Sequence, residues 1–188
     1  MATCNIGANS PEQYGDYFAW GETLPKNAYD WSNYKWCDGN SNSMTKYCIN
    51  NSFGTFDNKT ELEPEDDVAY VNWGSSWRMP TNDQLEELRL NCTWLWTEKN
   101  GVNGCKVIGP NGASLFLPAA GLYTDSSLKY VGRDGCYWSL TLAPFYIDGN
   151  GPIPTSANTL EFDQWSLEGF SFSRNVGLTV RAVYVPKN

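Results

Sequence analysis

A helix-start pattern near the middle of the chain is the local feature that most constrains the fold. Thr81 is followed three residues later by Gln84, which is the pattern of a capping box, and Asp83 adds a negative charge that favours a helix N-terminus. Apolar residues then recur at helical spacing, at Leu85, Leu88 and Cys92. The pattern predicts a helix over 82–92, with a cap that contributes about 1 kcal/mol.

The sequence after this helix is typical of short β-strands. Cys105–Ile108 and Ala113–Leu117 flank a Gly-Pro-Asn-Gly turn, and Pro118 to Gly121 end the second of them. Further strands are predicted at 137–139, 159–162 and 178–184. Alternation predicts one buried sheet face, and the expected buried residues are Leu115, Leu117, Val180 and Ala182, with Trp138 and Phe162 also in the core.

The first sixty residues are rich in turn sequences, such as Gly15-Asp16 and Asn50-Asn51. No linker or internal repeat interrupts the chain. We therefore expect a single α+β domain over 1–188, loop-rich, with a small antiparallel sheet and one or two helices. Its expected parts are a loop-rich region 1–66, a helix and sheet core 67–139, and a C-terminal binding region 140–184.

Composition excludes several classes of function. The 188 residues include no histidine, which removes Ser-His-Asp and Cys-His catalysis as well as His-ligated zinc. The net charge is −8, and the 13 basic residues form no stripe, so nucleic acid is not an expected partner. No apolar run approaches the length of a membrane span. These absences favour a binding protein over an enzyme.

Six cysteines are present without a CxxC pair, so a zinc ribbon is not supported. Cys37 and Cys48 bracket one Gly- and Asn-rich loop, and Cys92 and Cys105 bracket another. In an exported protein these pairs could form disulfides, whereas in a cytosolic protein they would be buried thiols. The sequence leaves both alternatives open.

An acidic run lies at Glu61, Glu63, Glu65, Asp66 and Asp67. Its oxygen ligands would suit Ca²⁺, but their spacing does not match an EF-hand loop. Acidic residues next to Pro64 are also typical of a solvated helix start, which is the interpretation that we prefer. No cofactor is expected, and a structural calcium ion is the alternative.

Two long segments, 140–158 and 163–176, separate the last predicted strands. Loops of this length in a compact domain are usually functional or disordered, and their aromatic content argues against disorder. Phe170 and Phe172 would share one face of an extended segment and form an apolar patch with a polar rim. The candidate binding residues are Phe145, Tyr146, Asp148, Asn150, Asp163, Gln164, Trp165, Phe170, Phe172 and Asn175. Arg181 is expected to pair with a carboxylate in a structural role.

Several short motifs occur in the order of a known family. They are Tyr14-Gly15-Asp16-Tyr17-Phe18-Ala19-Trp20-Gly21-Glu22-Thr23, Trp73-Gly74, Trp77-Arg78-Met79-Pro80-Thr81, Phe116-Leu117-Pro118-Ala119-Ala120-Gly121, Tyr137-Trp138-Ser139, and Gly177 with Val180-Arg181. Together they cover nearly the whole chain and resemble the Fibrobacter-type major paralogous domain of gut bacteria. That family is related to the formylglycine-generating-enzyme fold and to the variable proteins of diversity-generating retroelements. The resemblance implies a C-type-lectin-like fold on a displayed protein.

The chain departs from the catalytic and calcium-dependent branches of this group. The formylglycine-generating branch uses a late pair of reactive cysteines, whereas the last cysteine here is Cys136. The Glu-Pro-Asn, Gln-Pro-Asp and Trp-Asn-Asp motifs of calcium-dependent sugar binding are missing. Adenine-directed mutagenesis of asparagine-type codons cannot produce Trp, Gln, Lys, Met or Glu, and segment 140–159 contains none of these five. This gap is the one sign of retroelement diversification.

These observations predict an adhesion or receptor-type module that binds a protein or glycan through 140–176. The alternatives are a structural pilus or virion subunit, and a glycosidase with acids among Asp148, Asp163 and Glu168. The start at Met1 lacks the basic and apolar parts of a signal peptide. We therefore expect a trimmed form of an extracellular or cell-surface protein, with a phage virion as the alternative location.

Overall fold

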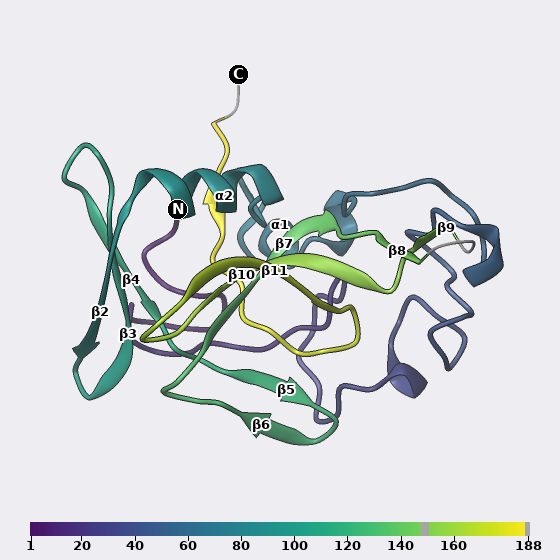
Figure 1. Cartoon of the computed structure of the whole chain (residues 1–188), viewed down its shortest axis with the longest axis horizontal. Helices are drawn as coiled ribbons and strands as arrows, with labels where there is room; N and C mark the ends of the chain where they lie inside the picture. The colour runs from purple at the N-terminus through teal and green to yellow at the C-terminus, as the bar shows by residue number, and fades with distance from the viewer. Residues whose placement is uncertain (148–150, 187–188) are drawn as a thin grey trace.

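The computed structural model describes residues 1–147 and 151–186. Strands in small antiparallel sheets, two α-helices and long connecting segments make up the mixed fold of this part of the chain (Figure 1). The helical elements are three 3-10 turns at Trp31–Asn33, Asn51–Phe53 and Pro64–Asp66, α1 (Val68–Trp73) and α2 (Asn82–Asn91). The strands are β1 (Trp77–Arg78), β2 (Thr93–Lys99), β3 (Val102–Ile108), β4 (Ser114–Pro118), β5 (Leu122–Thr124), β6 (Ser127–Lys129), β7 (Gly135–Leu142), β8 (Phe145–Ile147), β9 (Gly151–Ile153), β10 (Ser156–Phe162), β11 (Leu167–Ser173) and β12 (Val183–Tyr184).

Helix α2 confirms the capping-box prediction. The Thr81 hydroxyl accepts a hydrogen bond from the Gln84 N–H (3.2 Å), and the Gln84 side chain accepts one from the Thr81 N–H (3.1 Å). Leu85 is buried, and Leu88 and Cys92 pack in the same hydrophobic cluster. The helix ends at Asn91, one residue before the predicted end.

The segment between Cys92 and Cys105 is a β-hairpin, which corrects its interpretation as a loop. Strands β2 and β3 pair from Thr93 with Ile108 to Lys99 with Val102, and β4 extends this sheet. Trp94 and Trp96 alternate toward the hydrophobic cluster below α2, which explains why this polar-looking sequence is extended. The predicted strands at 105–108 and 113–117 correspond to β3 and β4.

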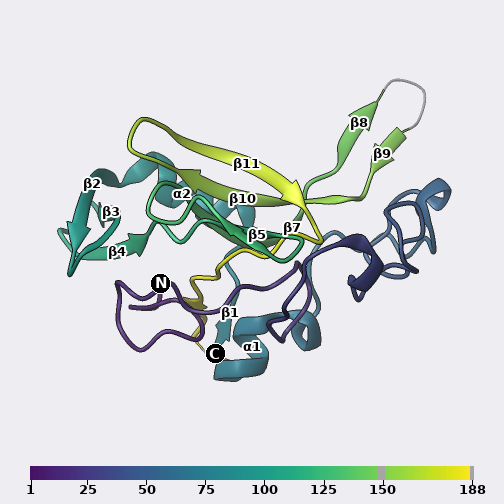
Figure 2. The ribbon, with the colours of Figure 1, turned by 90° about the horizontal axis from the view of Figure 1, so that it is seen from below.

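The second three-stranded sheet has the order β11–β10–β7. Strand β7 contains the predicted 137–139 strand, and β10 contains 159–162. Trp138 and Phe162 are fully buried, as predicted, on opposite sides of this sheet in two different clusters. Helix α2 contacts β7, β10 and β11, so it covers the side that carries Phe162 (Figures 1 and 2).

The predicted strand at 178–184 is mostly absent. Only Val183–Tyr184 forms strand β12, while 178 and 179 make isolated bridges to Phe18 and Tyr137. This segment passes through the interior, so its alternating apolar residues reflect burial on all sides. Val180 and Ala182 are buried in the largest hydrophobic cluster, called the main cluster here, which also contains Trp20 and Trp138. Leu115 and Leu117 instead pack below α2, so the four residues do not form one sheet face.

Two buried arginines hold the loop-rich N-terminal region to the C-terminal segment. Arg181 donates hydrogen bonds to the Asn5 side chain (2.7 Å) and to backbone carbonyls, including that of Phe116 (3.0 Å). This arrangement corrects the expectation of a carboxylate partner. Arg174 donates to the Tyr34 hydroxyl (2.9 Å) and to carbonyls of three further residues, and its guanidinium lies 4.9 Å from the centroid of the Trp20 ring.

All six cysteines are free. The ladder places Cys105 opposite Trp96, so Cys92 lies four residues further along the hairpin, about 13 Å away and beyond the reach of a disulfide. The thiols of Cys37 and Cys48 each donate to a backbone carbonyl. Burial raises the pKa of the Cys105 thiol to about 12, so this thiol is protonated at neutral pH.

The acidic run starts a helix, as expected, but two of its members are buried rather than solvated. Asp67 caps α1 by accepting hydrogen bonds from the N–H groups of Ala69 and Tyr70, and it also accepts one from the Met79 N–H. Asp66 is bound by Lys46 (2.6 Å) and by the Tyr47 hydroxyl (2.7 Å).

The carboxylates of Glu63, Glu65 and Asp66 lie close enough together to hold a metal ion. The Lys46 ammonium lies within 4 Å of all three, at 2.5, 3.7 and 2.6 Å. Hydrogen bonds from Lys46 and Lys59 lower the pKa of Glu63 to about 2. A lysine thus provides the positive charge for this cluster.

Candidate ligand-binding surface

The hairpin formed by β10 and β11 contains five of the ten candidate residues. Half of segment 163–176, predicted as a loop, is strand β11. Segment 140–158 contains the end of β7, the strands β8 and β9, and the start of β10. Both predictions of long loops are therefore wrong. The polar, glycine-containing sequence of β11 lacks clear alternation of burial because one edge and much of one face of this strand are exposed.

The tip of this hairpin is an ordered turn that presents Trp165. The Asp163 carboxylate accepts hydrogen bonds from the backbone N–H groups of Trp165 (2.5 Å) and Ser166 (2.6 Å), and these bonds lower its pKa. Trp165 is 85% exposed and Gln164 is also exposed. Asp163 thus positions the turn, and Trp165 is its most exposed large side chain.

Two phenylalanines follow on β11. The rings of Phe170 and Phe172 meet edge to face with centroids 5.4 Å apart, which confirms that they share one strand face. Phe170 is 51% exposed, whereas Phe172 is partly buried and packs against the main hydrophobic cluster. Phe170 therefore contributes to the surface and Phe172 supports it from the core side.

The other candidates do not join this surface. Tyr146 is 69% exposed on the β8–β9 hairpin, which projects from the opposite end of the sheet (Figure 2). Asn175 is held internally, since it accepts from the Ser173 hydroxyl and donates to the Tyr29 carbonyl. The backbone of Phe145 belongs to β8, while Asp148 and Asn150 lie outside the described residues. The structure thus places Gln164, Trp165 and Phe170 at separate points along one hairpin, with Asp163 holding the turn and Phe172 packing against the core.

The free edge of β11 exposes backbone hydrogen-bonding groups. The Asp163 N–H donates to the Ser166 carbonyl at the turn, and the Arg174 N–H donates to the Thr155 carbonyl at the far end. Hydrogen-bonded pairs alternate along an antiparallel ladder, so Glu168, Phe170 and Phe172 bond to β10. The N–H and C=O groups of the alternate positions, Leu167, Gly169 and Ser171, point away from β10.

A groove of about 540 Å³ lies between this edge and helix α2. Its lining residues are Asn82, Glu86, Arg89, Ala143, Pro144, Asn158, Gly169, Phe170 and Ser171. Arg89 binds both carboxylate oxygens of Glu86, at 3.1 and 2.7 Å. A Cβ atom on Gly169 would lie 2.4 Å from Glu86 Oε1, so glycine at this position lets the carboxylate lie directly against the strand.

Two carboxylates face each other across the hairpin. Glu161 of β10 pairs in register with Glu168 of β11. Burial, together with the nearby charges of Asp134, Glu168 and Asp163, raises the pKa of Glu161. Like charges directly opposite on neighbouring strands are destabilising, so this pair is unfavourable for the isolated hairpin.

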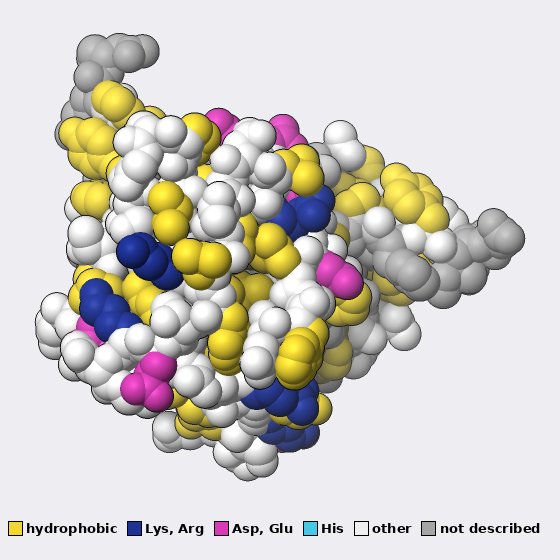
Figure 3. All heavy atoms as spheres, turned by 60° about the vertical axis from the view of Figure 1, so that its left-hand side comes forward, with side chains coloured by type: hydrophobic (Ala, Val, Ile, Leu, Met, Phe, Trp, Pro, Cys, Tyr) yellow, Lys and Arg dark blue, Asp and Glu magenta, His cyan; other side chains and the backbone are white. Residues whose placement is uncertain are grey.

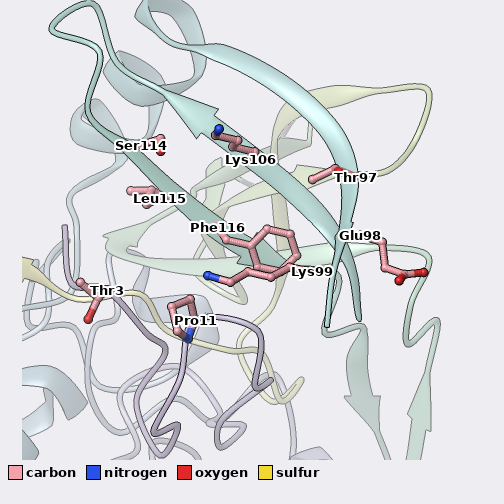
Figure 4. A pocket seen from close by; sticks show the side chains of 9 residues that line it. All are labelled: Thr3, Pro11, Thr97, Glu98, Lys99, Lys106, Ser114, Leu115 and Phe116. Atoms are coloured by element: carbon pink, nitrogen blue, oxygen red, sulfur yellow. The ribbon is translucent and has the colours of Figure 1, made fainter. Parts of the chain in front are cut away.

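A second cavity, of about 390 Å³, lies on the far side of the β2–β3–β4 sheet (Figure 4). The Phe116 ring lies at its centre, with the Lys99 ammonium 6.0 Å from the ring centroid and Lys106 on the neighbouring strand. Thr3 and Pro11 of the N-terminal segment complete its lining. On the side of the molecule that carries β2–β4, hydrophobic and basic side chains are interspersed at the surface (Figure 3).

Sequence reasoning missed the groove and this second cavity. Asn82, Glu86 and Arg89 have ordinary helix-surface spacing, and nothing in the sequence shows that they face β11. The sequence predicts Phe116 in a strand and in a family-like motif, but its cavity depends on contact with residues more than a hundred positions earlier.

No protein-family model matches the chain, and neither a curated protein nor a solved structure matches it. No helix in the described part of the chain is long and apolar enough to cross a membrane.

Proposed function

We propose that this chain is a ligand-binding module with a C-type-lectin-like fold, displayed on a cell surface or virion, that binds its protein or glycan ligand along the β10–β11 hairpin. The observation that carries the proposal is Trp165, whose side chain is 85% exposed on a turn tied down by Asp163. Exposing a tryptophan to water on an ordered turn is unfavourable for folding alone. Tryptophan is also the residue type most enriched among the dominant contacts of binding surfaces.

The surroundings of Trp165 support the same proposal. Phe170 adds a second exposed aromatic ring on the same hairpin. Gln164 and the edge groups of β11 supply polar contacts around the aromatic residues, which is the usual arrangement of an interface core and rim. The mixed and elongated shape suits a protein ligand better than a single sugar ring.

The test is a parallel glycan-array and protein-array screen with the wild-type chain and with a Trp165→Ala/Phe170→Ala variant. We expect the double variant to lose at least about tenfold in affinity for any ligand that the wild type binds, since such aromatic contacts contribute about 2 kcal/mol or more. Its melting temperature should stay within a few degrees because both side chains are exposed. Phe172 is left intact because its partly buried ring supports the core.

The matched control removes exposed apolar side chains elsewhere, at Leu24 and at Val71 of α1. Helix α1 lies on the other side of the molecule from β11 (Figure 2). A Leu24→Ala/Val71→Ala variant should bind like the wild type. Equal binding by the Trp165/Phe170 variant and the wild type would contradict the proposed surface.

A further inference from the structure

Strand β11 is an unprotected sheet edge. Within the described part of the chain it pairs with β10 on one side only, and Glu168 to Ser171 are exposed. Natural proteins protect such edges with proline, lysine, bulges or covering loops, because free N–H and C=O groups invite another strand. The sequence of β11, Leu-Glu-Gly-Phe-Ser-Phe-Ser, contains neither proline nor lysine, and its register with β10 is unbroken over all seven residues.

The neighbouring groove gives an added strand a place to lie. Domains that bind peptides by strand addition present an edge strand whose backbone supplies affinity while pockets beside it receive alternate side chains. Here the edge groups of Gly169 and Ser171 open onto the groove below α2. These two residues have no side chain or a small one, so an approaching backbone is not blocked.

The side chains along the edge indicate the chemistry of the incoming strand. On the face away from α2, Phe170 and Phe172 would contact apolar side chains at alternate positions. Glu168 lies on the same face opposite Glu161, and this carboxylate pair would be relieved by a basic side chain. A second copy of this chain would instead bring its own acidic residue, Glu168, to the same edge, in a chain whose net charge is already −8.

We propose that β11 takes up an extended segment of a partner protein as an additional strand, with apolar side chains over Phe170 and Phe172 and a basic side chain beside Glu168. This inference rests on the proposed function, since it specifies how the same hairpin binds its ligand. It requires hydrogen bonds between the backbone of the partner segment and the N–H and C=O groups of Leu167, Gly169 and Ser171.

The variant that tests the edge is Ser171→Pro, with Ser171→Ala as its matched control. The Ser171 N–H points outward, so proline removes an edge donor without removing a bond to β10, and edge strands tolerate proline at such positions. Random twelve-residue peptides displayed on phage are selected on the wild-type chain. We expect enriched peptides with alternating apolar residues and at least one Lys or Arg.

The best peptide is then synthesised and titrated against each variant by calorimetry. Ser171→Pro should weaken binding at least about tenfold, which corresponds to about 1.4 kcal/mol, while Ser171→Ala should change it by less than about twofold. Glu168→Lys should weaken binding of a basic peptide and favour its acidic counterpart. Two N-methylated forms of the peptide provide a test that needs no protein variant. Methylation of the alternate backbone nitrogens that face β11 should abolish binding, whereas methylation of the other alternate set, which faces away, should leave binding intact.

Failure of strand addition has three recognisable forms. The first is that the phage selection enriches no peptide above background. The second is that the peptide binds Ser171→Pro as tightly as the wild type, and the third is that both N-methylated forms of the peptide still bind. A dimer in sedimentation that Ser171→Pro dissociates would overturn the partner-strand proposal in favour of a second copy. An array ligand that loses affinity for the Trp165→Ala/Phe170→Ala variant and yet binds Ser171→Pro as tightly as the wild type would contradict strand addition. That result would still support the proposed function.

Discussion

At the scale of single residues, Glu161 is the clearest case of a charged side chain that is unfavourable for folding. It is only partly exposed, lies opposite Glu168, and has Asp134 and Asp163 among its neighbours. A sequence selected for stability alone would place a neutral or basic residue at one of these positions. Violations of this kind concentrate where a surface has a function beyond folding.

Removing the Glu161 charge should stabilise the protein at neutral pH. Because burial and the neighbouring carboxylates raise its pKa above 4.5 in the folded state, the native protein holds this proton more tightly than the unfolded chain. The contribution of Glu161 to stability is therefore most favourable below pH 4.5 and is lost as the pH rises through the folded pKa. Glu161→Gln should raise the free energy of unfolding at pH 7 and have little effect at pH 4 or below, as measured by urea unfolding.

Two controls make this result specific. Glu168→Gln should act in the same direction with a gain of up to about 1 kcal/mol, because it removes the opposing charge. Glu87→Gln, on the exposed surface of α2, should change stability little at either pH. A stability gain that is the same at pH 4 and pH 7 would show that charge is not the cause.

At the scale of elements, the β10–β11 hairpin depends on its turn. Asp163 accepts two backbone hydrogen bonds, and the ladder runs without interruption from this turn to Ser173. The turn therefore sets both the register of β11 and the position of Trp165. Asp163 therefore has a structural role in this turn, in addition to the predicted contact with a ligand.

Asp163→Ala should destabilise the protein and weaken ligand binding together. The loss of the two hydrogen bonds that Asp163 Oδ1 accepts should cost about 1 kcal/mol, the usual contribution of such a hydrogen-bonding side chain. Asp163→Asn should restore most of this stability, because asparagine forms the same kind of turn. Urea unfolding monitored by tryptophan fluorescence measures the first effect, and array binding the second. Full binding by a destabilised Asp163→Ala would contradict the positioning role.

At the scale of the whole molecule, contacts between distant parts of the chain hold together the long segments that have little secondary structure. Ala2, Ile6 and Phe18 donate backbone hydrogen bonds to the C-terminal segment 178–182. The three hydrophobic clusters draw their residues from segments far apart in the sequence. Arg174 and Arg181 add hydrogen bonds where loops would otherwise bury unsatisfied carbonyl groups.

Arg174→Leu should therefore be strongly destabilising. It would leave the Tyr34 hydroxyl and the carbonyls of Lys46, Tyr47 and Pro154 without their buried donor. We expect a loss of about 3 kcal/mol or more in the free energy of unfolding, since each buried unsatisfied group costs about 1–3 kcal/mol. Arg133→Leu, at an exposed arginine, is the control and should cost less than about 1 kcal/mol. Similar losses in both variants would contradict the anchoring role.

Local interactions alone determined part of this structure. The capping box of α2 and the β3–β4 hairpin with its Gly-Pro-Asn-Gly turn depend on residues within about fifteen positions of each other, so the sequence predicts them. The sequence also singles out Trp165 and Phe170 as candidate binding residues, because large aromatic residues in a polar segment stand out. Trp165 lies in a turn between strands, whereas Phe170 lies in strand β11, which the sequence did not reveal because the pattern of an edge strand is weak.

Only the tertiary structure decided the rest. It placed 178–182 in the interior without a sheet, gave Arg181 an amide and carbonyl partners instead of a carboxylate, and set α2 beside β11 to form the groove. Each of these outcomes depends on which distant segment supplies a burial partner or a hydrogen-bond acceptor. Hydrophobic periodicity indicates that a residue is buried, whereas packing between distant segments determines which residues surround it. The candidate binding surface depends on that packing.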